Sequence, residues 1–349
     1  MSPATAHIFE SEMNIRPATI ALIAFFAAMM IAFGVFAPRF ASASNMEDLM
    51  GNFSFIAILA MGEAFPILTR GIDLSIGAIV ALVGMVIFDM VLILHVPGYV
   101  VLPTALLVGT LAGAFNGVLI VFVRLQPFIA TLATLATYRG IVYAISGRQI
   151  VQGLTTTPIS DRWITGLENY FDVGGWLGLT KIIQMPWFPL SFFIMLGMFA
   201  ALQFTLLTTR FGRSVYTVGG NAEAARLAGI NTGRVIIASY SISGFCAAVA
   251  ALLLVAKLTT STEALGFGME LSAIAAAVIG GVSLAGGAGS VFGPALGAFL
   301  LGAILLGLTL LHISQYVQQV ITGAILLAAV GYDRLLLVRR QRRLAAGGS

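Results

Sequence analysis

A short polar stretch at residues 219–230 has the clearest potential for a specific contact, because it separates two long apolar segments. Asn221 is a favourable N-cap residue, and Glu223 falls in the first turn, where a negative charge stabilises the helix dipole. Gly229 can then end the helix in the left-handed conformation. The predicted helix is about 10 Å long and too short to be stable alone in water, so it needs a surface to lie on.

Two kinds of surface suit such a helix. Lipid headgroups favour a helix face rich in lysine, whereas docking on another protein favours a small apolar face. The predicted face is small and apolar, formed by Ala224, Leu227, Ala228 and Ile230. We therefore expect loop 209–233 to contact a partner protein, with an ordinary helix resting on lipid headgroups as the alternative.

Five polar residues inside or beside apolar segments are further candidates, because such residues in a membrane are costly and usually functional. Glu63 lies near the middle of its segment and is either a polar lining group or a carboxyl paired within the fold. Asp73 follows a helix break and is expected to cap the next helix. Asn116 and Gln126 either bond helix to helix or contact a hydroxylated solute, and Arg139 either snorkels or pairs. Structural use is favoured for Asn116 and Gln126, and all five are candidates for a translocation pathway.

Residue types for metal or nucleotide chemistry are scattered. His7, His95 and His312 have no metal-ligand spacing, and the single cysteine, Cys246, excludes a disulfide within the chain. No cluster of His, Asp and Glu gathers in the apolar segments, which disfavours a membrane-embedded enzyme. No Walker-type phosphate loop occurs in the sequence. We expect no bound cofactor or metal, and any ATP that drives this protein must be hydrolysed by another polypeptide.

Glycines recur every four residues within two apolar segments. Gly109, Gly113 and Gly117 share one helix face, and Gly293 and Gly297 share another. Small residues at this spacing let helix backbones approach closely in a membrane. These glycines are therefore expected to pack helices together.

The composition defines the broad class. Hydrophobic residues make up 59% of the chain and charged residues only 9%, with a mean hydropathy of +1.01. Soluble domains carry about 25% charged residues. Apolar runs of about 20 residues recur, the length that crosses the hydrocarbon of a bilayer. The sequence predicts an all-α, polytopic membrane protein, and its net charge of +4 is better explained by arginines that hold topology than by nucleic-acid binding.

About ten spans are predicted from the apolar runs. Their ranges are 17–37, 52–70, 76–95, 99–123, 127–146, 187–208, 234–256, 270–286, 291–311 and 315–332. The first is expected to be a retained helix and not a cleaved signal peptide, because it is long and follows a polar start. The whole chain, 1–349, is interpreted as one transmembrane domain.

Arginine placement predicts the orientation. Basic residues gather in loop 209–233 and in the tail 333–349, so both are expected to be cytoplasmic. The parity of the spans then places the N-terminal tail 1–16 inside as well. Loop 147–186 falls outside; it contains Trp163 and Trp176, with Trp187 directly after it, and is either a loop packed at the membrane interface or a landing surface for a soluble partner.

A short motif occurs once in each half of the chain. Residues 71–75 and 268–272 both read glycine, apolar, acid, leucine, serine. They introduce the third and eighth predicted spans, so the period is five helices. Because five is odd, the halves are expected to be inverted repeats. The first motif is then expected on the cytoplasmic side and the second outside.

Several motifs occur in an order that resembles the permease subunits of ribose-, xylose- and arabinose-type sugar ATP-binding-cassette importers. The similarity covers about residues 50–335, and the motifs are GIDLSIG at 71–77, QPFIATL at 126–132, RG at 139–140, GRSVYTVGGN at 212–221, EAARLAGI at 223–230, AVIGG at 277–281 and GGAGS at 286–290. The chain departs from the expected pattern at Glu63 and Pro66, which bears on the substrate and not on the class.

The resemblance implies a set of partners and a coupling site. It implies a cytoplasmic ATPase subunit, a periplasmic sugar-binding protein and a second permease copy, identical or paralogous, in a bacterial inner membrane. The residues expected to couple the chain to the ATPase are Asn221, Glu223, Ala224, Ala225, Leu227 and Gly229. The expected solute is a sugar or polyol. The alternative function is an ion-coupled secondary transporter, which also often has inverted repeats and carboxylates at mid-membrane, but has no need of a short capped helix in loop 209–233.

Overall fold

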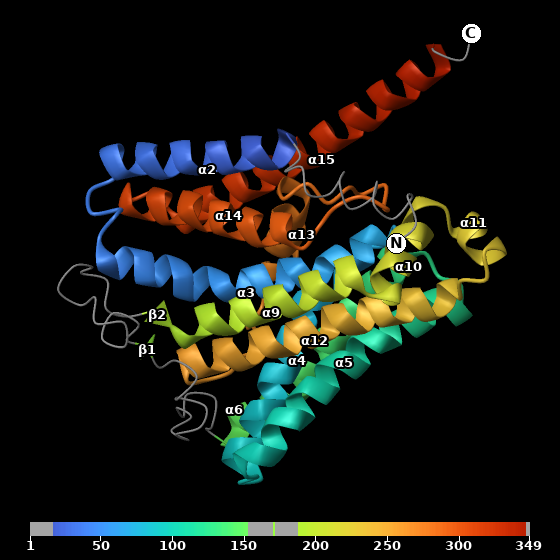
Figure 1. Cartoon of the computed structure of the whole chain (residues 1–349). Coiled ribbons are helices and arrows are strands. Elements are labelled where there is room, and N and C mark those ends of the chain that lie inside the picture. The colour runs from blue at the N-terminus through green and yellow to red at the C-terminus, as the bar shows by residue number, and fades with distance from the viewer. Residues whose placement is uncertain (1–16, 153–169, 172–187, 347–349) are drawn as a thin grey trace.

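The structure is a computed structural model that describes residues 17–152, 170–171 and 188–346 (Figure 1). Most of the expected outer loop 147–186, the chain's three tryptophans and the N-terminal tail lie outside the described residues. The described elements, in chain order, are α2 (Pro17–Phe36), α3 (Ala43–Leu68), α4 (Ile76–Phe88), the π-helical turn η1 (Asp89–Ile93), α5 (Gly98–Phe122), α6 (Pro127–Gln152), β1 (Tyr170–Phe171), β2 (Phe188–Pro189), α9 (Leu190–Thr208), α10 (Arg210–Gly220), α11 (Ala222–Leu227), α12 (Thr232–Leu258), α13 (Met269–Ile279), α14 (Phe292–Leu310) and α15 (Gln315–Ala346).

The helical class is confirmed, since the described strands are one antiparallel pair of two-residue segments. Within the described residues, seven helices are long and apolar enough to cross a membrane. Three further predicted spans, 17–37, 270–286 and 315–332, correspond to shorter apolar helical stretches, Ile20–Phe36, Met269–Ile279 and Gln315–Gly331. The all-helical architecture is therefore observed, with seven candidate membrane spans among the described residues, and the count of ten spans stays a prediction.

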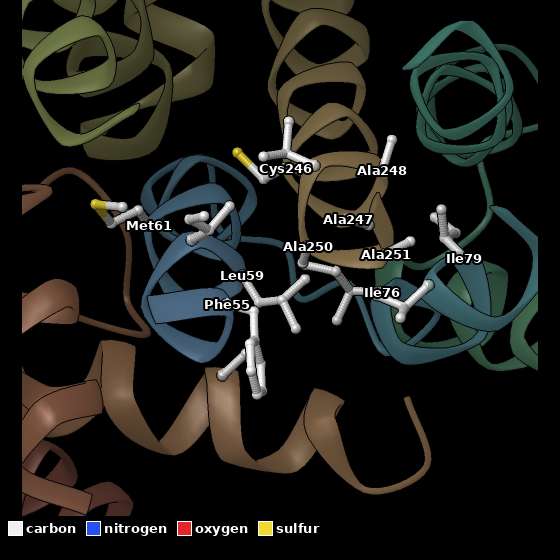
Figure 2. Packing of buried hydrophobic residues seen from close by; sticks show 14 of the residues in the cluster. Phe55, Leu59, Met61, Ile76, Ile79, Cys246, Ala247, Ala248, Ala250 and Ala251 are labelled. Carbon is white, nitrogen blue, oxygen red and sulfur yellow. The ribbon is translucent and has the colours of Figure 1, made fainter. Parts of the chain in front are cut away.

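The helices form a bundle with α3 and α12 at its centre. α12 packs on α5, α3 and α4, while α3 also contacts α14, α13 and α9. Side chains from α3, α4 and α12 meet in the core, where Figure 2 labels Leu59, Ile76 and Ala250 among others. α10 and α11 lie at one end of the bundle and the two strands at the other (Figure 1). The first of these is called the α11 end below.

Glycines bring α5 and α12 into backbone contact. A Cβ atom added to Gly113 would lie 2.1 Å from the carbonyl oxygen of Tyr240, and one added to Gly109 would lie 2.6 Å from that of Gly244. Gly293 and Gly297 likewise meet the backbone of residues 276–280. The predicted packing role of the spaced glycines is confirmed, and it explains how α5 lies so close to α12.

The predicted eighth span is wrong at its C-terminal end. α13 stops at Ile279, and residues 280–291 form turns instead of continuing the helix to 286. Gly281, Gly286 and Gly287 have φ values of 86°, 79° and 71°, which L side chains rarely adopt. The apolar composition of this glycine-rich stretch resembles that of a span, although its backbone is a loop.

Replacing Gly113 by alanine is expected to destabilise the bundle by about 1–3 kcal/mol, because the new Cβ meets backbone atoms of α12 that cannot move aside alone. The control is Gly197→Ala on α9, where nothing lies within 4 Å of an added Cβ. Unfolding in detergent can be followed by a thiol-reactive dye, because the single cysteine, Cys246, is buried. An unchanged melting temperature for Gly113→Ala would contradict this account of the α5–α12 contact.

Candidate functional site

The short helix predicted in loop 209–233 is present as α11, Ala222–Leu227. The Asn221 side-chain oxygen accepts hydrogen bonds of 3.0 Å from the backbone N–H groups of Glu223 and Ala224. Gly229 follows the helix with φ of 81°, so both predicted caps are confirmed. Glu223 also pairs with Arg226 at 2.7 Å on the exposed side of the helix.

The outer face of α11 is open. Leu227 is 82% exposed, and Ala224 and Ala228 beside it are exposed as well. Ala225 is fully buried, so it holds the helix against the bundle and is not available for docking. The other predicted coupling residues stand on the open side. An exposed leucine flanked by alanines, on a helix fixed at both ends, is a surface suited to a protein partner.

The junction of α10 and α11 is fastened to the bundle by an arrangement that we call the Arg70 clamp. Arg70 follows the end of α3 and donates through Nε to the carbonyl oxygen of Gly219, at 2.6 Å, and through a terminal nitrogen to that of Gly220. The backbone N–H of Gly287 donates to the carbonyl oxygen of Leu68 at 2.9 Å. The clamp therefore joins the end of α3, the start of α11 and the loop between α13 and α14.

Close backbone packing supports the clamp. A Cβ on Gly219 would lie 1.7 Å from the carbonyl oxygen of Leu68, so only glycine fits there. The Tyr216 hydroxyl on α10 donates to the carbonyl oxygen of Gly289 at 2.8 Å. The sequence analysis did not identify Arg70. The available signal was a basic residue directly before the motif at 71–75, at the end of an apolar helix.

Residues 69–75, which include Arg70, form a non-helical break between α3 and α4. The polar groups at this break meet in a buried cluster. One Asp73 carboxyl oxygen accepts from the Ser75 N–H at 3.0 Å, the Ser75 hydroxyl at 2.7 Å and the Asn116 amide at 3.3 Å. The other accepts from the Ser243 hydroxyl at 3.0 Å. Asp73 thus receives donors from the break itself, from α5 and from α12. The N-cap residue of α4 is Ser75, without a side-chain cap bond, so Asp73 does not cap α4 as expected and instead accepts the N–H of the N-cap residue.

Glu63 and Thr134 complete this cluster. A Glu63 carboxyl oxygen accepts from the backbone N–H of Asp73 at 2.8 Å, and the Thr134 hydroxyl donates to the Asn116 side-chain oxygen at 2.6 Å. The members of the Asp73 network, all at most 3% exposed, are Glu63, Asp73, Ser75, Asn116, Thr134 and Ser243. Of the two interpretations of Glu63, pairing within the fold agrees with this geometry.

The remaining pathway candidates lie apart from the network. Gln126 is exposed at the start of α6. Arg139, on α6, is half-buried and donates through one terminal nitrogen to the carbonyl oxygens of Glu263 and Leu265, both at 2.8 Å. The structure therefore brings Glu63, Asp73 and Asn116 together and leaves Gln126 and Arg139 elsewhere. A role for any of the five in translocation stays a prediction. No three His, Cys, Asp or Glu side chains within the described ranges could together hold a metal ion.

Comparison with known proteins gives one consistent result. Residues 45–330 match the family described as branched-chain amino acid transport system / permease component. The ribose import permease protein RbsC of Haemophilus influenzae is 36% identical over 300 residues, covering 86% of this chain and 88% of the relative. No solved structure matches the chain.

Two further relatives have similar coverage. The D-allose transport system permease protein AlsC of Escherichia coli K12 is 36% identical, covering 89% of this chain and 90% of the relative. The xylose transport system permease protein XylH of the same strain is 34% identical, covering 84% and 85%. The resemblance to sugar-importer permeases is confirmed by these matches. The chain belongs to the branched-chain amino acid transport system / permease component family, whose members are transport subunits and not enzymes.

Proposed function

We propose that this chain is the membrane-spanning permease of an ATP-driven importer and that it translocates a neutral sugar or polyol. The observation that carries this proposal is α11, a short helix. Its apolar outer face is exposed, and the residues directly before its N-terminus are fixed by the Arg70 clamp. A helix so short is not stable by itself in water; Ala225 and the clamp hold it on the bundle, and its exposed apolar face is left available to a partner. The ribose, allose and xylose transport of the named relatives supports the solute class.

The partners follow from the same reasoning. Because the sequence has no phosphate loop, an ATPase subunit must supply hydrolysis, and we assign its docking surface to the open side of α11. A binding protein would deliver solute at the opposite end of the bundle. A second permease copy, identical or paralogous, would complete the membrane part. In this proposal the protein lies in a bacterial inner membrane with both termini in the cytoplasm, and the α11 end is cytoplasmic.

Coupling would run through the Arg70 clamp and the Asp73 network. Movement of α11 pulls on Gly219 and Gly220, which Arg70 connects to the break at 69–75. Asp73 holds that break to α5 and α12. A displacement at the docking surface would thus change the position of α4, the helix that starts at the break. This chain of contacts is contiguous in the structure, and packed side chains and hydrogen bonds of this kind can carry coupling between distant sites.

The ten-span inverted repeat remains part of the proposal, with one correction. The motifs at 71–75 and 268–272 do not lie at opposite faces. A Cβ on Gly77 would lie 2.1 Å from the Glu270 carboxyl, so the helices that follow the two motifs begin close together. The chain reaches them from opposite ends of the bundle, since α12 starts beside α11 and ends at the far side. Two helices that begin at the same depth, but that the chain reaches from opposite ends of the bundle, support an inverted repeat.

The secondary-transporter alternative is favoured by one observation, the two buried carboxyls of Glu63 and Asp73. Acidic groups at such positions carry protons or ions in many transporters. Both carboxyls accept hydrogen bonds from the break or its neighbours, however, and all the side-chain donors to Asp73 come from Ser and Asn residues. A structural role at the break explains these bonds without a transported ion.

One prediction of this proposal concerns the docking surface on α11. Gly229→Val should abolish uptake and reduce copurification of the ATPase, because a β-branched residue is strained at a φ of 81°. Gly229→Asn is the matched control, since asparagine tolerates this conformation, and it should retain most uptake. Leu227→Asp should also lose the ATPase while remaining inserted. Normal uptake and copurification in both Gly229→Val and Leu227→Asp would remove the docking assignment.

The second prediction concerns the energy source. In vesicles that contain permease and ATPase, uptake should require ATP on the side where a Leu227→Cys variant is labelled and the binding protein on the other side. It should persist when the proton gradient is collapsed at constant ATP. Uptake driven by a proton gradient through this chain alone would contradict the proposal and establish the secondary transporter.

A further inference from the structure

The segment 259–268, which joins α12 to α13, re-enters the bundle without forming a helix. α13 has 11 residues and is therefore about 16 Å long, about half of the 30 Å hydrocarbon thickness of a bilayer. A helix of that length cannot begin at one face and reach the other. The residues before it must cover the remaining depth, and we call 259–268 the re-entrant segment.

Contacts with α4 place the deep end of this segment. Ser243, which bonds Asp73, lies near the middle of the 27-residue helix α12. Gly77 is four residues beyond Asp73, at the start of α4, and a Cβ there would lie 2.5 Å from the carbonyl oxygen of Gly266. At the other end of the segment, Gly84 faces Ser261 and Leu265. The segment therefore descends along α4 to a level near the middle of the bundle.

One side of the re-entrant segment is open. Leu265 and Gly266 are buried against α4, but Ala264 is exposed and Phe267 is 77% exposed. Irregular backbone within the hydrocarbon region does not face lipid; it is buried in protein or lines a water-filled cavity. The open side must therefore face an aqueous passage or another protein.

The open side also carries a charged group, Arg139. The guanidinium carbon of Arg139 lies 5.8 Å from the centroid of the Phe267 ring, close enough for a cation–π contact. The hydrogen bonds from Arg139 to Glu263 and Leu265 fasten the segment to α6. Glu270, at the start of α13, is half-buried, and its carboxyl oxygen without a hydrogen-bond partner among the described residues is buried towards Gly77 of α4, away from the open side. Ionisable groups at this depth face water or protein and not lipid.

We propose that Phe267 and Arg139 form a contact site for a neutral polyhydroxylated solute as it crosses the membrane. The proposal rests on the function proposed above and adds the site within the permease. The exposed Phe267 ring offers an apolar surface to the C–H face of a sugar ring. The Arg139 donors not used by Glu263 and Leu265 are placed to bond hydroxyl groups. An apolar platform with a few polar groups is the usual composition of a small-molecule site.

Two glycines and Arg139 fix the position of Phe267 on the open side of the re-entrant segment. Gly266 and Gly268 flank it with φ values of 70° and 78°, which turn the chain so that Phe267 points away from α4 while Gly266 contacts it. Arg139 then holds one side of the ring. The ring is thus a positioned group on the open side of a fixed segment, which is what a contact site for a passing solute requires.

Uptake by Phe267→Ala tests the site. We expect the rate to fall about tenfold through loss of the aromatic contact, while ATP hydrolysis stimulated by the binding protein is retained. Phe267→Tyr should keep most uptake. The matched control is Phe204→Ala on α9, which removes another exposed phenylalanine (64%) from a regular helix and should have no effect.

Water access provides the second readout. In a Cys246→Ala background, Phe267→Cys should react with a charged, water-soluble thiol reagent in at least one nucleotide state, and the transported solute should slow the reaction. Phe204→Cys, facing lipid, should not react. The proposal requires both the uptake loss and the labelling. Absence of either, or a disulfide between two copies through Phe267→Cys without reagent labelling, would overturn it and assign this face to permease–permease contact.

The two proposals fail separately. A wild-type permease that needs no ATP or binding protein would contradict the proposed function. A wild-type permease that needs both, with a Phe267→Ala variant that transports normally, would contradict only the contact site.

Discussion

Backbone polar groups inside an apolar bundle have no water to bind, so every interruption of a helix must be supplied with protein partners. The break at 69–75 is the place where this requirement shapes the molecule. Asp73 accepts four hydrogen bonds there, from Ser75, Asn116 and Ser243, and its own N–H is taken by Glu63. One carboxyl thereby fixes the start of α4 relative to α5 and α12, and the glycine contacts between α5 and α12 keep those two helices at the same short distance.

The break lies between the docking surface on α11 and the re-entrant segment. On one side, the Arg70 clamp ties it to α11 and its open apolar face. On the other, α4 runs along the re-entrant segment, whose deep end lies within reach of Gly77. A rigid path thus leads from the docking surface to the middle of the bundle. This arrangement gives a reason for two costly carboxyl groups in the core. They hold the break between α3 and α4 in place, and because these two helices are not continuous, α4 can move relative to α3.

Local features were predictable from the sequence, and distant pairings were not. The caps of α11 and the glycine faces of α5 and α14 follow from spacing along one helix, so they were found. Asp73 and Ser243 are 170 residues apart, and no local pattern joins them. The same holds for Arg70 with Gly219. The end of α13 was missed because the loop at 280–291 is apolar and glycine-rich, and hydropathy does not separate such a loop from a span.

The central claim is that Asp73 holds the break by accepting hydrogen bonds, and that this is what transmits coupling. It is tested most directly by the ratio of solute imported to ATP hydrolysed in vesicles carrying Asp73→Leu or Asp73→Asn permease. Leucine leaves several buried donors without a partner, at about 1–3 kcal/mol each, whereas asparagine keeps an acceptor. The account predicts a ratio at least about tenfold lower for Asp73→Leu, with the ATPase still bound, and a ratio near wild type for Asp73→Asn. A wild-type ratio for Asp73→Leu would contradict it.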